Sequence, residues 1–164
     1  MESADDLVRR AQSNLACKDY QSAIADCTWA IKLRPDFMVA YFYRGKAKLE
    51  LRDYQEAIID LSRAIGMKQD FAQAYHLRAL AKTSTADYHG AIADLTKTIN
   101  LNGDDAEAYF DRGAAYLGVG QKSEAIRGFE RAMKLGYRIP PELMRMLYQM
   151  CMAPGMPKRQ KQTT

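Results

Sequence analysis

The sequence is poor in the residues on which metal and covalent chemistry usually depends. Among its 164 residues are only three cysteines, two histidines and one tryptophan. Cys17, Cys27 and Cys151 are odd in number and have no C-x-x-C spacing, which argues against a disulfide framework and against a zinc knuckle. His76 and His89 belong to no H-E-x-x-H motif. We therefore expect no enzyme activity, no catalytic residues, no metal site and no cofactor.

Long apolar runs and a strong charge of one sign are also missing. No apolar run reaches the roughly 18 residues of a membrane-spanning helix, and the acidic start of the sequence is unlike a secretory signal. The net charge is +4, and three of its positive charges, Lys158, Arg159 and Lys161, lie in the last seven residues. The nearly neutral remainder argues against a nucleic-acid partner, because such surfaces need clustered cations. We expect a cytoplasmic protein, or alternatively a nuclear one, with no membrane span.

What the sequence does contain is a period of 34 residues. Arginine recurs as Arg10, Arg44, Arg78 and Arg112; alanine as Ala23, Ala57, Ala91 and Ala125; and aspartate as Asp26, Asp60 and Asp94. Within each period, apolar residues follow helical spacing on both sides of a short polar break. Each unit is therefore predicted to be a helix, a turn and a second helix.

These units resemble the tetratricopeptide repeat. They share with that family a small residue in the first helix, an alanine in the second helix and a tyrosine at the turn, here Tyr20, Tyr54 and Tyr88. Pro35 supplies the family's terminal proline in the first unit. The resemblance implies an all-α fold, a right-handed superhelical solenoid of antiparallel helix pairs.

We place the boundaries of the repeats by this period. The predicted segments are four repeats at 4–37, 38–71, 72–105 and 106–139, a C-terminal capping helix at 140–152 and a flexible basic tail at 153–164. Pro141 and Glu142 favour a helix start, because proline fits the first turn and a negative charge suits its N-terminus.

The arginine and aspartate series are predicted to be structural. The series contain four arginines but only three aspartates. Gly128 takes the aspartate position in the last predicted repeat, which no further repeat follows. This suggests that each aspartate pairs with the arginine of the next repeat and fixes the register between repeats. The predicted pairs are Asp26 with Arg44, Asp60 with Arg78, and Asp94 with Arg112. Pairing inside each repeat, the alternative, would leave Arg112 without a carboxylate.

The resemblance also implies that the first helices line a concave groove where partners bind. The groove positions carried over to this sequence are Val8, Gln12, Val39, Phe42, Lys46, Leu49, Gln73, His76, Leu80 and Phe110. This mostly apolar surface predicts a non-enzymatic adaptor or scaffold that binds a peptide or an amphipathic helix of a partner protein. Phe42 and Phe110 are the expected anchors, because aromatic residues dominate binding hot spots. The alternative is that both rings only pack within the array or meet the chain's own C-terminal segment.

One known use of the family is a clamp for the C-terminal carboxylate of a chaperone. By alignment, the clamp positions fall on Val8, Gln12, Tyr43, Gln73 and Leu77. None of these side chains is a lysine or arginine, so two-point carboxylate capture is not expected. A co-chaperone that uses another groove chemistry is kept as an alternative function.

The C-terminal segment suggests a third function. Five of the nine methionines lie between Met144 and Met156, and flexible methionines suit adaptable surfaces. A surface of Met144, Leu147, Tyr148 and Met150 is therefore predicted to form a homo-oligomer, which would make the protein a self-assembling structural subunit. Methionine as core filler is an equally weighted alternative.

Overall fold

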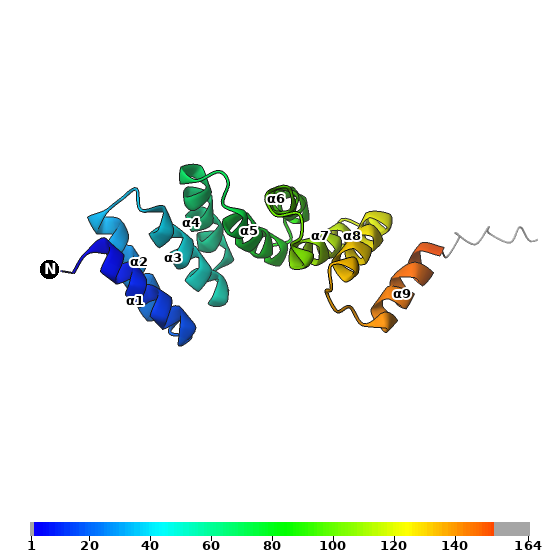
Figure 1. Cartoon of the computed structure of the whole chain (residues 1–164), viewed down its shortest axis with the longest axis horizontal. Coiled ribbons are helices and arrows are strands. Elements are labelled where there is room, and N and C mark those ends of the chain that lie inside the picture. Colours follow the sequence, from blue (N-terminus) through cyan, green and yellow to red (C-terminus); the bar gives the residue numbers. More distant parts are fainter. Residues whose placement is uncertain (1, 153–164) are drawn as a thin grey trace, which may run out of the picture.

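The protein is a stack of α-helices, as the sequence predicts (Figure 1). The computed structural model describes residues 2–152, which form nine helices and no strand. The first helices of the four pairs are α1 (Ala4–Ala16), α3 (Met38–Glu50), α5 (Ala72–Ser84) and α7 (Ala106–Gly118). Their second helices are α2 (Tyr20–Leu33), α4 (Tyr54–Met67), α6 (Tyr88–Leu101) and α8 (Lys122–Lys134), and α9 (Pro141–Met152) follows. The predicted basic tail at 153–164 and the side chain of Met150 lie outside the described residues.

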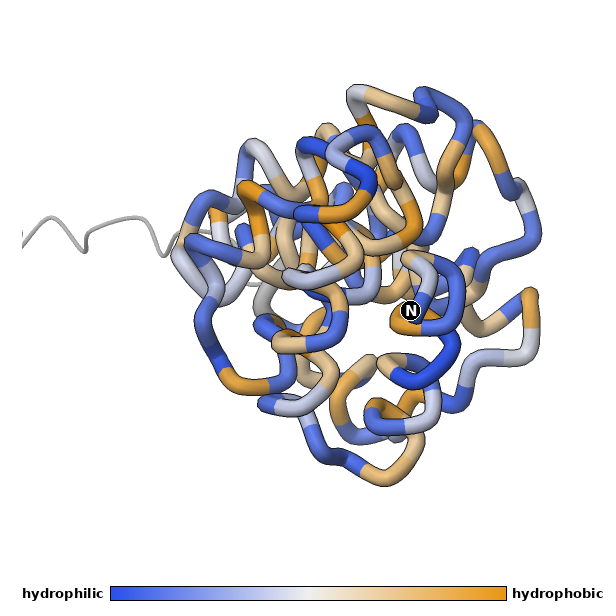
Figure 2. The backbone as a smooth tube through the Cα atoms, turned by 90° about the vertical axis from the view of Figure 1, so that its left-hand side faces the viewer, coloured by the Kyte–Doolittle hydropathy of each residue, from blue (hydrophilic) through white to orange (hydrophobic). Residues whose placement is uncertain are grey.

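The helices are stacked in the order of the sequence. Each helix packs against the next, and the first helices also contact one another, α1 with α3, α3 with α5 and α5 with α7. Figure 2 looks along the stack and shows the chain winding about its long axis. The first helices therefore form one continuous wall of a superhelical solenoid. None of the described helices is long and apolar enough to cross a membrane.

The alanine series marks the points where helices approach most closely. Ala23, Ala57, Ala91 and Ala125 are all fully buried. Glycine also permits close approach on the facing helix, because a Cβ at Gly113 would lie only 3.0 Å from the carbonyl oxygen of Ala125. Small residues at these positions let the two helices of a repeat touch, because a larger side chain would force them apart.

The turn inside each repeat has one shape throughout the array. The residue two positions before the second helix has a positive φ in every repeat: Lys18 (60°), Arg52 (63°), Ala86 (61°) and Gly120 (76°). The next residue then donates its backbone N–H to a carbonyl of the last turn of the first helix, as from Asp53 to Lys48 at 2.9 Å. This left-handed closure satisfies carbonyls that the helix end leaves free.

The last helix covers the end of the array. Met144 and Leu147 of α9 are buried against Ile126 and Phe129 of α8 and against Ile139. This contact removes from water the apolar face that α8 would otherwise expose. The methionine-rich segment therefore provides a cap.

Candidate partner-binding groove

The arginine and aspartate series pair inside each of the first three repeats. The predicted pairs between repeats, Asp26 with Arg44, Asp60 with Arg78 and Asp94 with Arg112, are therefore wrong. Arg44 donates from Nε and Nη2 to the two carboxylate oxygens of Asp60, at 2.8 and 2.7 Å. Arg78 binds Asp94 in the same way, at 2.8 and 2.6 Å. The arginine on the first helix faces the aspartate on the second helix of its own repeat, where the planar guanidinium can engage both oxygens.

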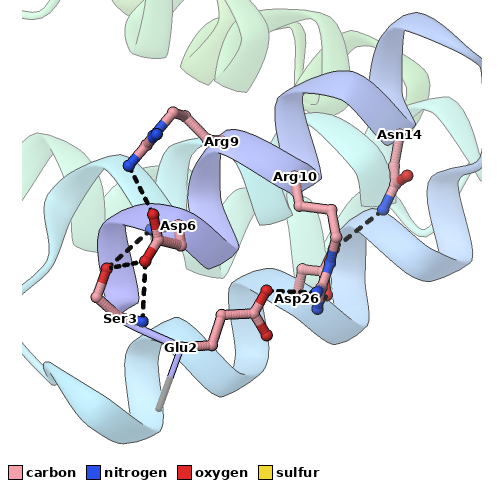
Figure 3. A network of polar contacts seen from close by, with 7 residues as sticks. All are labelled: Glu2, Ser3, Asp6, Arg9, Arg10, Asn14 and Asp26. Atoms are coloured by element: carbon pink, nitrogen blue, oxygen red, sulfur yellow. Dashed lines mark hydrogen bonds and ion pairs between the residues drawn. The ribbon is translucent and has the colours of Figure 1, made fainter.

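The first repeat follows the same rule at the end of the array (Figure 3). Arg10 and Asn14 both donate to Asp26, and Arg10 also pairs with Glu2. Arg10 is about half exposed, whereas Arg44 and Arg78 are 18% and 17% exposed. The pair in the first repeat is therefore the most hydrated of the three.

A second set of hydrogen bonds connects successive repeats. The free Nη1 of each arginine reaches back to a hydroxyl of the preceding repeat: Arg44 to Thr28 at 3.2 Å, Arg78 to Ser62 at 2.9 Å and Arg112 to Thr96 at 3.4 Å. The arginines thus do join neighbouring repeats, but through neutral hydroxyl acceptors. In the fourth repeat Gly128 offers no carboxylate, and within the described part of the chain the buried Nε of Arg112 finds no hydrogen-bond partner.

Two hollows lie along the wall of first helices. The N-terminal hollow, of about 550 Å³, lies between α1 and α3 and is lined by residues that include Gln12, Lys18, Tyr43, Lys46 and Glu50. The C-terminal hollow, of about 480 Å³, extends to α5 and α7 and includes Gln73, His76, Asp105 and Glu107. Tyr43 and Lys46 line both. The two hollows therefore adjoin along the first helices, and we refer to the pair of hollows as the groove.

Half of the predicted groove residues line this groove: Gln12, Phe42, Lys46, Gln73 and His76. The others have different surroundings. Val8 is buried in the core cluster that Val39 contacts. Leu49 and Leu80 are half-buried. Phe110 stacks on Tyr137, with ring centroids 4.6 Å apart, and also contacts Phe129.

Phe42 itself is only 7% exposed. Its ring packs on Phe71 at a centroid distance of 4.6 Å and against the edge of Tyr43 at 5.2 Å. Phe42 therefore supports the groove from below, and the neighbouring Tyr43 presents its ring to both hollows. The sequence placed Tyr43 only at a clamp position and did not point to Glu50 or Asp105, because the superhelical twist decides which side of each helix faces the groove.

An acidic cluster surrounds His76 at the C-terminal end of the groove. Nε2 of His76 lies 2.7 Å from Oδ2 of Asp111, and Nδ1 lies 4.0 Å from Oδ2 of Asp105. Burial lowers the pKa of His76, but the hydrogen bond with Asp111 and the charges of Asp111, Asp105 and Glu107 outweigh burial and raise this pKa above its ordinary value. Burial and the charges of Asp111 and Glu107 also raise the pKa of Tyr137. This end of the groove is therefore negative.

The predicted oligomer surface is divided between the two sides of α9. Met144 and Leu147 face α8 and are buried. Tyr148 is exposed, and so are Met146 at 50% and Met133 at 44%. A hollow of about 350 Å³ between α8 and α9 is lined by Tyr148 and Met133, with Glu130, Lys134 and Met144. Individual apolar side chains of α8 and α9 therefore stay exposed after the cap has packed.

A solenoid of helix pairs with a groove along its first helices belongs to the class of helical-repeat interaction scaffolds. Residues 39–71 match the family profile described as tetratricopeptide repeat. Together with the 34-residue period, this match shows that the chain resembles the tetratricopeptide repeat family, and the nine described helices fit repeats followed by a capping helix. Proteins of this family generally act as protein-protein interaction modules without enzyme activity.

Solved structures share this fold. The chain is similar to MamA, with 27% identity, a TM-score of 0.78 and coverage of 82% of this chain and 78% of that chain. MamA from Desulfovibrio magneticus RS-1 gives 22% identity, a TM-score of 0.78 and coverage of 82% and 76%. The first repeat domain of Spaghetti (RPAP3), solved with the HSP90 peptide SRMEEVD, gives 19% identity, a TM-score of 0.70 and coverage of 72% and 94%. A comparison with curated proteins finds no significant sequence match.

Proposed function

We propose that the protein is a scaffold that binds an extended peptide of a partner protein in the groove along its first helices. The observation that carries this proposal is that the two hollows adjoin at Tyr43 and Lys46, so that together they extend from α1 to α7. An extended segment could contact three or four repeats there at once.

The charges along the groove define the chemistry of such a peptide. Lys46 stands in the middle, and Asp105 and Glu107 stand at the α7 end. A peptide with an acidic residue at Lys46 and a basic residue towards α7 matches both charges. Tyr43 supplies the aromatic surface between them, and tyrosine is enriched at binding hot spots. The clamp positions on these helices present no lysine or arginine, so a chaperone's terminal carboxylate is not the proposed ligand.

A displayed peptide library, selected on the full chain, tests the groove. Selected peptides should bind Lys46→Glu and Tyr43→Ala variants at least about tenfold more weakly, because each change removes a central contact. Lys97→Glu is the matched control. Lys97 is exposed on α6, the second helix of the third repeat, and does not line the groove, so its charge reversal should leave the dissociation constant unchanged.

A charge exchange makes the test specific. Replacing the peptide's acidic residue by lysine should restore binding to the Lys46→Glu variant. Circular dichroism confirms that each variant is folded. Equal weakening by Lys97→Glu, or peptides indifferent to Tyr43 and Lys46, would contradict the groove proposal.

Self-assembly through the cap is the second candidate function. The favouring observation is that Met133 and Tyr148 line the hollow between α8 and α9 and stay exposed, while Met144 and Leu147 are buried. This candidate requires an assembly larger than a monomer in light scattering. A strictly monomeric mass at high protein concentration contradicts it.

A further inference from the structure

Helices α5 and α7 bring together ligand atoms that lie far apart in the sequence. His76 is on α5, while Glu107 and Asp111 are four residues apart on α7 and so share one helix face. One ligand atom from each of these three residues can be chosen so that all lie within 4.8 Å of one another. Because His76 and Asp111 are 35 residues apart, motif spacing in the sequence gives no sign of this arrangement.

We propose that His76, Glu107 and Asp111 form a binding site for one divalent transition-metal ion of the zinc class, at the α7 end of the groove. One imidazole nitrogen and two carboxylates are a ligand set that zinc accepts, at bond lengths of about 2.0 to 2.2 Å. Ligand atoms around one such ion lie about 3 to 4 Å apart. The three groups therefore need side-chain adjustments of only about an ångström, without a change in the helices.

The contact between His76 and Asp111 shows what the ion would replace. Nε2 of His76 and Oδ2 of Asp111 are 2.7 Å apart and are joined by a hydrogen bond, so that one proton lies between them. A metal ion takes the place of that shared proton, because a ligating histidine must be neutral at the coordinating nitrogen. Three carboxylates face this one histidine, so a dication also offsets the excess negative charge of the cluster.

Asp105 is placed to orient the histidine ring. It lies on the other side of the ring, with Oδ2 at 4.0 Å from Nδ1. Its Oδ1 is held by the backbone N–H of Ala108 at 3.0 Å. Metal-binding histidines usually donate their second ring N–H to a carboxylate or carbonyl group. A small approach of Asp105 to Nδ1 would complete this arrangement and leave Nε2 for the ion.

The site is open to the groove. Glu107 is exposed, and His76 and Glu107 both line the C-terminal hollow. Three protein ligands leave one or more coordination positions for water or for a side chain of a bound partner. Binding of the ion does not depend on the peptide-binding proposal, because it is measured on the chain alone.

Zinc titration of the metal-free full chain tests the site. Isothermal calorimetry, supported by metal analysis after dialysis, should give one Zn²⁺ per chain. The variants His76→Ala and Asp111→Asn should each weaken binding by at least about tenfold, because each removes a ligand. Zinc should also raise the melting temperature of the wild type, since the ion links α5 to α7 in the folded state. His76→Ala should lose this shift.

Two control variants separate this site from other zinc ligands. His89→Ala changes the second histidine of the chain, which is exposed. Cys17→Ser removes an exposed thiol. Both variants should bind zinc as the wild type does, and Co²⁺ bound to either should show no thiolate charge-transfer band. Zinc binding that survives in a folded His76→Ala variant, or that disappears with His89 or Cys17, would overturn the proposal. So would a wild type that binds no zinc.

Discussion

Asp60 shows at the scale of single residues how the array uses charge. Its side chain is 3% exposed and accepts hydrogen bonds from Arg44, and Lys48 Nζ lies 2.8 Å from its second oxygen. Two cationic side chains, 18% and 12% exposed, therefore lie against this carboxylate, and of the two only Lys48 has a second carboxylate, that of Glu56 at 3.0 Å, among the ion pairs of the described residues. Removing a carboxylate from a buried pair is costly chiefly because the remaining charge stays poorly hydrated.

We expect Asp60→Ala to lower the free energy of unfolding by about 3 kcal/mol. The matched change Asp26→Ala should cost only about 1 kcal/mol, because Arg10 is half exposed, is paired with Glu2 and can be hydrated. Urea unfolding of both variants measures the difference. Equal losses would contradict the view that burial of the arginine sets the cost.

The residue scale is also where sequence reasoning was least reliable. The 34-residue period places Asp60 16 residues after Arg44 and 18 residues before Arg78, and spacing alone cannot say which arginine its side chain reaches. Phe42 raises the same difficulty, because the superhelical twist and its contact with Phe71 decide its exposure. Both questions depend on side-chain directions, which a repeat pattern does not contain.

At the scale of elements, the period and the apolar spacing were sufficient to predict the helix pairs, and the resemblance to the tetratricopeptide repeat implied the all-α solenoid. The left-handed turn residues were not predictable in this way. Lys18, Arg52 and Ala86 have positive φ values without being glycine, and only Gly120 carries the usual sequence signal of that conformation. Three of the four repeats therefore accept local strain for a common turn shape.

This strain predicts opposite effects for two exchanges between alanine and glycine. A left-handed conformation costs a non-glycine residue roughly 1 to 2 kcal/mol. A change to glycine removes this cost, but the greater freedom of glycine in the unfolded chain offsets part of the gain in stability. Ala86→Gly should therefore raise the free energy of unfolding by about 0.5 to 1 kcal/mol. Gly120→Ala should lower it by a similar amount. Thermal or urea unfolding measures both, and changes in the same direction would refute the explanation.

At the scale of the whole molecule, stability is distributed along the stack. Each helix packs mainly on its sequence neighbours, so the effect of a change at one end should fade within about one repeat. The cap is where this property can be examined, because α9 touches the array through α8. Its inward and outward faces also carry separate residues, Leu147 at 3% and Met146 at 50% exposure.

We expect Leu147→Asp to release α9 from α8, because it places a charge against the apolar cluster around Phe129. Hydrogen exchange followed by mass spectrometry should then show lost protection in α8 and α9, with α1 to α4 unchanged. Met146→Asp, one residue away and exposed, should leave protection as in the wild type. If protection falls evenly from α1 to α8 in the Leu147 variant, the array unfolds as one cooperative unit and the cap stabilises all of it.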